Sequence, residues 1–174
     1  MPRIPVGPNF YYEQDVRRLA ITLVDDLTSN TVILPALYLQ HNPQTMKLSH
    51  SKIINRYTTF GGMIEEHWGE ELDTLTCAGT TGGFIAEEFG YNTFDRKNTL
   101  AYHKFEDILD VYRNNGNVYD SLGRVIQKGY VNIFFDPTTY FGEFESFNYI
   151  EDANNPYRFT FDFVFKVDKT YSGI

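Results

Sequence analysis

The sequence predicts a mainly β protein, a β-sandwich or partly open antiparallel barrel with one flanking α-helix. Only one stretch, residues 99–116, has the 3.6-residue apolar period of a long helix. Residues 157–167 alternate without a break, which is the period of a half-buried strand. The chain also carries 15 Phe, 13 Tyr and 1 Trp, and aromatic residues favour strands and interfaces. A single late helix does not fit repeated βαβ units, so the strands are expected to be antiparallel.

The N-terminal residues 1–15 are predicted to form an extended arm without a core of its own. Three prolines and one glycine fall within its first eight positions. Such an arm is either disordered or laid across a partner chain. The rest of the chain, residues 16–174, is predicted to be a single β domain, and its length is sufficient for one substantial core.

Most of the domain is predicted to be strand, at residues 16–23, 31–40, 46–56, 72–77, 130–135, 140–150 and 157–167. Pro35 cannot donate to a ladder, so its strand is expected at a sheet edge or to carry a bulge. Between residues 58 and 84, the pairs Gly61-Gly62 and Gly82-Gly83 bracket a strand-like middle around Trp68. Gly69, directly after Trp68, predicts a bulge or a close backbone approach.

The helix predicted at 99–116 has clear start and stop signals. Thr99 can cap its first turn, with Asn98 as the alternative, and Asn114, Asn115 and Gly116 tolerate the left-handed turn that ends a helix. The face expected to pack on the sheet consists of Ala101, Phe105, Ile108, Leu109 and Tyr112.

Composition excludes several classes of protein. A formal net charge of −8 argues against a protein that wraps nucleic acid, because such a protein needs a basic surface. One cysteine cannot make an internal disulfide. No apolar run approaches the roughly twenty residues that span a bilayer, and the first residues do not resemble a signal peptide. We therefore expect a protein that stays in the cytoplasm or in something assembled there, without a membrane.

A cluster of potential metal ligands is formed by Glu65, Glu66, His67, Glu70 and Glu71. A zinc site needs further His or Cys at a defined spacing, such as HExxH, and His41, His50 and His103 are scattered. The cluster is therefore interpreted as a charged strand end, and no metal site is predicted. No cofactor is predicted either, because residues 79–83 are glycine-rich but lack the lysine of a phosphate loop.

Glu143 and Glu145 are the only candidate catalytic pair. Two residues apart on a strand, their carboxylates would share one face roughly 6.6 Å apart, and paired carboxylates can hydrolyse glycosides. The alternative interpretation is two solvated glutamates on an exposed face. A second alternative function is a carbohydrate-binding module that uses exposed Tyr side chains and Trp68. Cys77 has no recognisable His and Asp partners and is expected to be a small core residue.

Two segments carry a resemblance to a known family. The first is residues 39–84, with the block HWGEELDTL, and the second is residues 105–167, which ends in GEFESF and NPYRFTFDFVFKV. Together they resemble tail and baseplate proteins of tailed bacteriophages that share the tail-tube fold. The resemblance implies two packed antiparallel sheets with a flanking helix. It also implies a ring of subunits, expected to be hexameric, whose neighbouring strands complete a channel that conducts DNA without sequence-specific binding.

The function that the resemblance implies is structural, in a virion tail assembled in the host cytoplasm, with no catalytic residues. Its partners would be other copies of this chain or tail-tube, baseplate or tape-measure proteins. The proline-rich arm and the long segment 58–97 depart from the simplest tube subunit, so tube, baseplate and connector positions all remain open. The residues expected at subunit interfaces or in a structural role are Gly61, Gly62, His67, Trp68, Gly69, Glu71, Leu72, Phe144 and Phe147.

Overall fold

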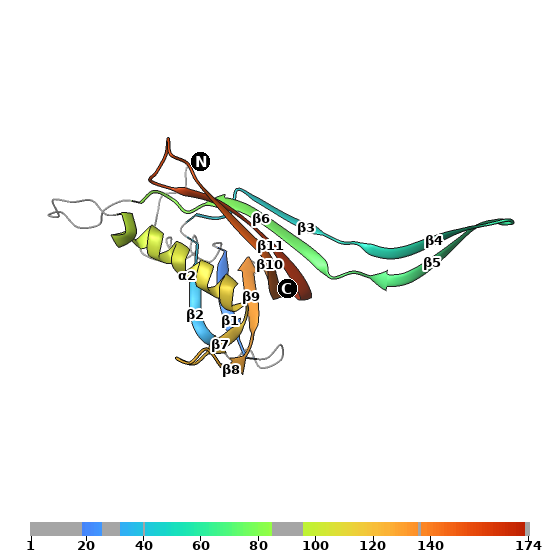
Figure 1. Cartoon of the computed structure of the whole chain (residues 1–174), viewed down its shortest axis with the longest axis horizontal. Helices are drawn as coiled ribbons and strands as arrows, with labels where there is room; N and C mark the ends of the chain where they lie inside the picture. The colour runs from blue at the N-terminus through green and yellow to red at the C-terminus, as the bar shows by residue number, and fades with distance from the viewer. Residues whose placement is uncertain (1–18, 26–31, 40, 85–95, 136, 173–174) are drawn as a thin grey trace, which may run out of the picture.

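A seven-stranded antiparallel sheet forms the body of the protein, in the strand order β2-β1-β9-β10-β11-β6-β3 (Figure 1). The computed structural model describes residues 19–25, 32–39, 41–84, 96–135 and 137–172. The strands of this sheet are β1 (Ala20–Val24), β2 (Val32–Tyr38), β3 (Thr45–Ser49), β6 (Asp73–Thr80), β9 (Tyr130–Phe135), β10 (Thr138–Glu151) and β11 (Phe159–Ser172). Outside it are a 3-10 turn η1 (Arg96–Asn98), one helix α2 (Leu100–Asn114), and the paired strands β4 (Lys52–Thr59) with β5 (Gly62–Glu70) and β7 (Asn117–Tyr119) with β8 (Val125–Lys128). The predicted class, mainly antiparallel β with one flanking α-helix, is confirmed.

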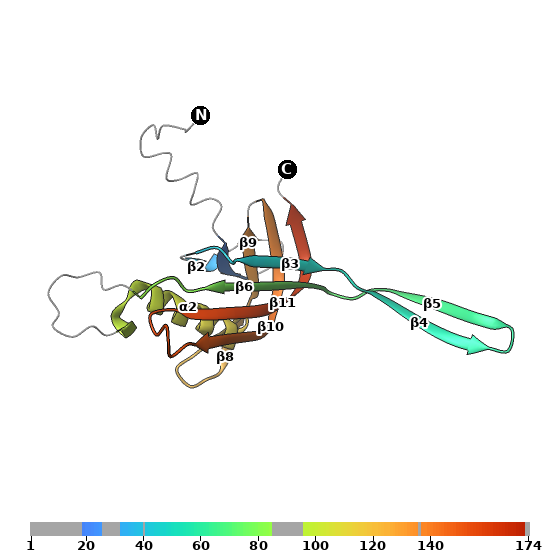
Figure 2. The same ribbon diagram turned by 90° about the horizontal axis from the view of Figure 1, so that it is seen from above.

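The two longest strands, β10 and β11, bend the sheet. The start of β10 pairs with β9, whereas the start of β11 pairs with β6. Between these halves the register shifts from Phe141↔Lys169 to Gly142↔Val167, which leaves a bulge in β11. A Cβ at Gly142 would lie 1.9 Å from the Lys166 carbonyl oxygen, so only glycine allows this approach. In Figure 2, the part of β10 and β11 that lies next to β9 runs at a steep angle to β3 and β6.

Helix α2 begins and ends at the predicted signals. The Thr99 side chain accepts a hydrogen bond from the Tyr102 amide at 3.3 Å, so Thr99 rather than Asn98 is the N-cap. Asn115 ends the helix in the left-handed region, at φ 44°, and its amide donates to the Val111 carbonyl at 2.8 Å. The buried face consists of Ala101, Phe105, Ile108 and Val111, while Leu109 and Tyr112 are only half-buried. The packed stripe is therefore centred closer to Val111 than the sequence predicted.

Asn115 also fastens the end of α2 to the sheet. Its side-chain nitrogen donates to the Phe144 carbonyl at 3.0 Å, and its side-chain oxygen accepts from the Phe144 amide at 2.8 Å. The register of β10 and β11 shifts between Phe144 and Ser146, so the side chain satisfies backbone groups where the ladder is irregular.

The core lies between α2 and the sheet and is built mainly of phenylalanine. Phe161, Phe163 and Phe165 of β11 are buried on one face, as the alternation predicted. The rings of Phe161 and Phe163 stack on Phe147 of β10 at interplanar angles of 7° and 4°. Burial of each such side chain contributes about 1.5–3 kcal/mol. Tyr157 is an exception, because it precedes β11 and is exposed.

Other sequence predictions are corrected or extended. The strand predicted at 46–56 is two strands, β3 and β4, interrupted at residues 50–51. The short strands β7 and β8 were not predicted, because residues 114–123 contain several turn-forming residues and the stretch was interpreted as a turn. Pro35 lies in β2, which is an edge strand of the main sheet as predicted. The arm predicted at 1–15 lies outside the described residues.

Candidate assembly site

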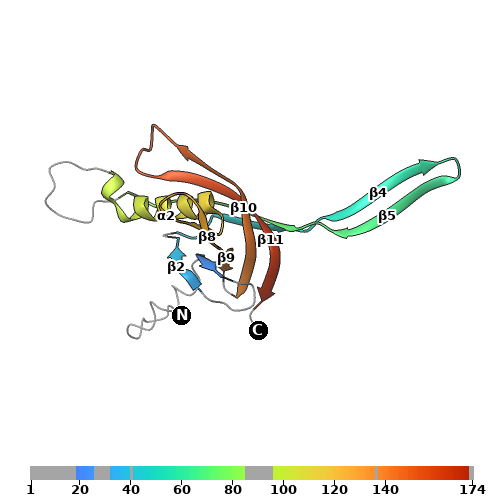
Figure 3. The ribbon, with the colours of Figure 1, turned by 60° about the horizontal axis from the view of Figure 1, so that its bottom comes forward.

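The hairpin of β4 and β5 projects beyond the sheet, as the right side of Figure 1 shows. It continues from the paired strands β3 and β6, which form the edge of the main sheet. Eight residues of β4 at about 3.3 Å each give a projection of roughly 26 Å. Figure 3 shows the hairpin and α2 at opposite ends of the molecule. The hairpin therefore receives no cover from the helix.

The root of the hairpin is the pair of links at residues 50–51 and 71–72. The Glu71 amide donates to the Ser51 carbonyl at 2.9 Å, and His50 Nδ1 lies 2.6 Å from Asp73 Oδ1. Leu72 is exposed beside these contacts. Two predicted candidates, Glu71 and Leu72, therefore lie at the joint where the hairpin leaves the sheet.

The tip of the hairpin is a two-residue turn at Phe60 and Gly61, since Thr59 pairs with Gly62. Thr59 Oγ1 donates to the Gly62 carbonyl at 2.9 Å. Gly62 has φ +136°, a backbone conformation that side chains of L residues rarely adopt. The paired glycines singled out in the sequence thus form a tip, and Phe60 is fully exposed on it.

A bulge near the root explains the Trp-Gly pair. The register shifts between Ile53↔Gly69 and Ile54↔His67, so Trp68 is the extra residue on β5. Gly69 has φ +112°, which accounts for the glycine after Trp68. The bulge predicted from Gly69 is confirmed.

Alternation along the strands gives the hairpin two unlike faces. Tyr57 and Ile64 pair directly and share one face, and Ile53 and Trp68 have the same parity along their strands. We call Ile53, Tyr57, Ile64 and Trp68 the apolar face, although Asn55 and Glu66 interrupt it. The opposite face carries exposed Ile54 and Met63 and also a charged group. There Arg56 Nε lies 2.9 Å from Glu65 Oε1, and His67 Nε2 lies 3.9 Å from Glu65 Oε2.

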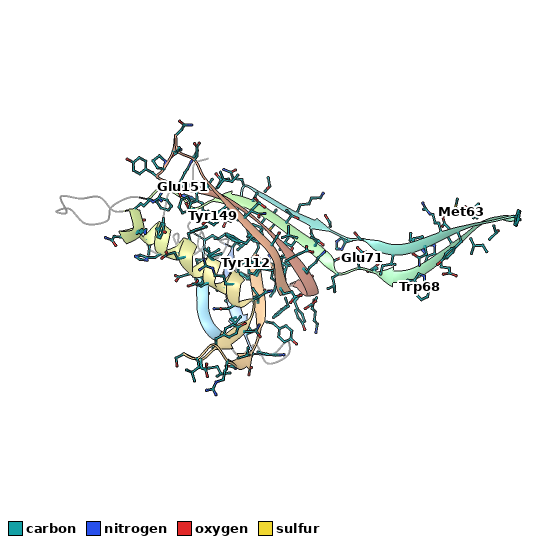
Figure 4. All side chains as sticks on the ribbon, in the orientation of Figure 1. Met63, Trp68, Glu71, Tyr112, Tyr149 and Glu151 are labelled. Atoms are coloured by element: carbon teal, nitrogen blue, oxygen red, sulfur yellow. The ribbon has the colours of Figure 1, made fainter. Side chains whose placement is uncertain are left out.

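Every residue of β4 and β5 is exposed. Trp68 is 66% exposed and Met63 64% exposed, and both are labelled on the projecting ribbon in Figure 4. A two-stranded hairpin alone is marginally stable in water. An exposed apolar patch on a projecting element is typical of a surface that binds another protein. The site candidates Gly61, Gly62, His67, Trp68 and Gly69 all lie on this hairpin.

Phe144 and Phe147 have a different location. Phe144 is buried, and Phe147 is half-buried and packed against the same core beneath α2. Their rings contact Phe163, at centroid distances of 5.3 Å and 6.3 Å. Within this chain these two candidates therefore have a structural role in the core.

The candidate catalytic pair does not form a cleft. Glu143 and Glu145 are both exposed on β10. Glu143 pairs with Lys166, whereas Glu145 is the extra residue where the register shifts between Phe144 and Ser146. Glu145 Oε2 lies 3.6 Å from Lys166 Nζ. The cavity of about 490 Å³ beside α2 is lined by other residues. The geometry thus favours solvated glutamates over the glycan-cleaving alternative.

The other candidates for chemistry were a metal site and a reactive cysteine. Among the described residues, no three His, Cys, Asp or Glu side chains converge in a way that could hold a metal ion. Cys77 is buried in the core, and this burial raises the pKa of its thiol from 9.0 to about 12. The thiol is therefore protonated and unreactive at neutral pH. No described helix is both long and apolar enough to cross a membrane.

Comparison with known proteins gives structural likenesses only. Neither a protein-family model nor a curated protein sequence matches the chain. It is similar to the sheath/tube terminator of an extracellular contractile injection system, at 11% identity, 99% coverage of both chains and a TM-score of 0.39. It is similar to the tube-terminating cap of the anti-feeding prophage, at 11% identity, 99% and 95% coverage and a TM-score of 0.40.

A chain in the virion of a native gene transfer agent is also similar, at 13% identity, with 90% of this chain and 96% of that chain covered and a TM-score of 0.43. With identities of 11–13% and TM-scores below 0.5, these likenesses do not assign a role to this chain.

Proposed function

We propose that this chain is a non-enzymatic structural subunit of a phage-tail-like tube, or of the baseplate or connector ring at one end of it. In this role it joins neighbouring copies or related tail proteins through the β4–β5 hairpin. The single observation that carries the proposal is the apolar face of that hairpin, which extends past the sheet with its side chains in solvent.

Burial of the apolar face is the driving force for assembly. Trp and Tyr side chains are enriched at the centres of protein interfaces, where they supply large contact areas at a low entropy cost. A partner that covers Ile53, Tyr57, Ile64 and Trp68 would remove four large side chains from water. The charged face, with Arg56, Glu65 and His67, would stay towards solvent or set the register of the contact.

The edges of the main sheet support a ring rather than a closed pair. Strands β2 and β3 form the two edges of the sheet, and they lie at opposite ends of the strand order. Each edge strand leaves one row of backbone hydrogen-bonding groups without a partner in this sheet. A contact between unlike surfaces of successive copies is head-to-tail, and such contacts close into rings when the rotation allows.

The charge of the chain fits a channel that conducts DNA. A net charge of −8 would repel the phosphate backbone, so DNA could pass a ring of these subunits without being retained. Sequence-specific binding of DNA is not part of the proposal.

The test is negative-stain microscopy with sedimentation velocity on the purified full-length chain, alone and with its tail partners. The wild type is expected to form rings or tubes. The double variant Tyr57→Ser, Trp68→Ser should remain a folded monomer, because it removes the two largest side chains of the apolar face. Arg56→Gln on the opposite face is the matched control and should still assemble. A wild type that is monomeric in every mixture would overturn the proposal.

A further inference from the structure

A groove separate from the hairpin lies beside the C-terminal half of α2. It has a volume of about 490 Å³ and opens between α2, β7 and the edge of the sheet formed by β1 and β2. Leu23, Leu37, Val111 and Val118 give it an apolar lining. Because β2 is an edge strand, this end of the sheet has no further strand to cover the groove in the described structure.

The rim of the groove on the α2 side is acidic. Asp107 and Asp110 both line it and both are exposed. Asp110 Oδ1 lies 3.1 Å from Arg113 Nη1 on the same helix. Among the described residues no ion pair is formed by Asp107. The groove therefore suits an extended apolar segment that carries a cation.

The N-terminal segment of the chain has this chemistry. Residues 1–12 contain one cation, Arg3, and no acidic residue. Ile4 and Val6 share a face when the backbone is extended. The three prolines in this segment favour an extended conformation and reduce the entropy lost when it is bound. The charge and the apolar pattern of the segment both complement the groove.

The position of Leu19 indicates which copy supplies the segment. The Leu19 amide donates to the Asn42 side chain at 3.0 Å, and the Leu39 amide donates to the Leu19 carbonyl at 3.1 Å, so the chain enters the sheet at a fixed point. Leu23 in the groove is four residues further, about 13 Å along β1. A segment that occupies the groove of its own copy would have to turn back along β1 before Leu19, whereas a segment from a neighbouring copy needs no such reversal.

We propose that residues 1–9 of one copy occupy the groove of a neighbouring copy, with Ile4 and Val6 against Leu37 and Val118 and Arg3 at Asp107. This contact rests on the proposed assembly of copies, and it adds a second connection that does not involve the hairpin. Each subunit then reaches its neighbour with an arm as well as presenting the hairpin.

Cross-linking between introduced cysteines tests the contact in the full-length chain. The single native cysteine, Cys77, is buried and does not interfere. A tagged Val6→Cys chain is mixed with an untagged Val118→Cys chain under assembly conditions and treated with a short bis-maleimide. A cross-linked pair that contains one tagged and one untagged chain is expected. The matched control replaces Val118→Cys by Thr160→Cys, an exposed site outside the groove, and should give at least about fivefold less product.

A charge swap tests the role of Arg3. Arg3→Glu or Asp107→Lys alone should lower the yield of cross-linked pairs about threefold to fivefold, and the two changes together should restore it. A yield equal to that of the Thr160→Cys control, or a yield that neither single charge change lowers, would overturn the proposal.

The two proposals fail in distinguishable ways. Rings or tubes seen by microscopy without the Val6–Val118 cross-link would remove the arm contact and leave the proposed function intact. Absence of both assemblies and cross-links would remove both proposals.

Discussion

The pair β10–β11 and the hairpin β4–β5 are built alike but have opposite surroundings. Both are long antiparallel pairs with large apolar side chains on one face and a bulge near a glycine. In β10–β11 that face is covered by α2 and is buried, whereas in β4–β5 every residue is exposed. An apolar face on a strand therefore predicts burial, but it does not identify the molecule that covers the face.

The largest expected effect contrasts one phenylalanine from each region. Phe163→Ala should lower the free energy of unfolding by about 3–5 kcal/mol, because it leaves a cavity among the stacked rings of the core. Phe60→Ala at the hairpin tip should change it by less than about 0.5 kcal/mol, because the ring contacts only solvent in the monomer. Urea unfolding of the two variants measures both values at monomeric concentrations. Similar losses for the two would contradict the contrast.

The next effect concerns the fastening of α2 over the core. Asn115→Ala should lower the free energy of unfolding by about 2–3 kcal/mol, since it removes two hydrogen bonds to Phe144 and strains a left-handed residue. Asn115→Gly keeps the conformation and loses only the hydrogen bonds, so its loss should be about 1–2 kcal/mol. Thermal or urea unfolding of the pair separates the two contributions. Equal losses would mean that the backbone conformation contributes nothing.

The smallest effect concerns thiol chemistry in the two regions. Burial raises the pKa of Cys77 to about 12 in the folded protein, so its unfolded form loses the proton first as the pH rises above 9.0. This contribution to stability is complete below pH 9, and about 1 kcal/mol of it should be lost at pH 10. A Cys77→Ala variant should not show this component of the pH dependence. Native Cys77 should resist a thiol reagent at pH 8, whereas a cysteine introduced at Thr58 on the hairpin should react at once.

The elements whose bounds and faces depend on nearby residues could be predicted from the sequence. The caps of α2 follow from Thr99 and Asn115, whose side chains act within a few residues of themselves. The buried face of β11 follows from strict alternation, and the edge position of β2 follows from the missing amide of Pro35.

Features that depend on residues far apart in the sequence could not be predicted from it. The alternation from Met46 to Arg56 gives no sign that the strand changes partner from β6 to β5 at residues 50–51. Trp68 and Phe163 look alike in a pattern, although one is exposed and the other is buried. The groove beside α2 joins residues from four separate elements, and no local motif predicts it.

The joint between the sheet and the hairpin has a mechanical consequence. Regular pairing stops at residues 50–51 and 71–72, and one backbone hydrogen bond, from Glu71 to Ser51, joins the two links. Torsion of the ribbon about this joint leaves the ladders on both sides intact, so it is resisted far less than bending of β10–β11. In the assembly proposed above, this joint would let subunits of one sequence meet their partners at several tilts while each core stays rigid.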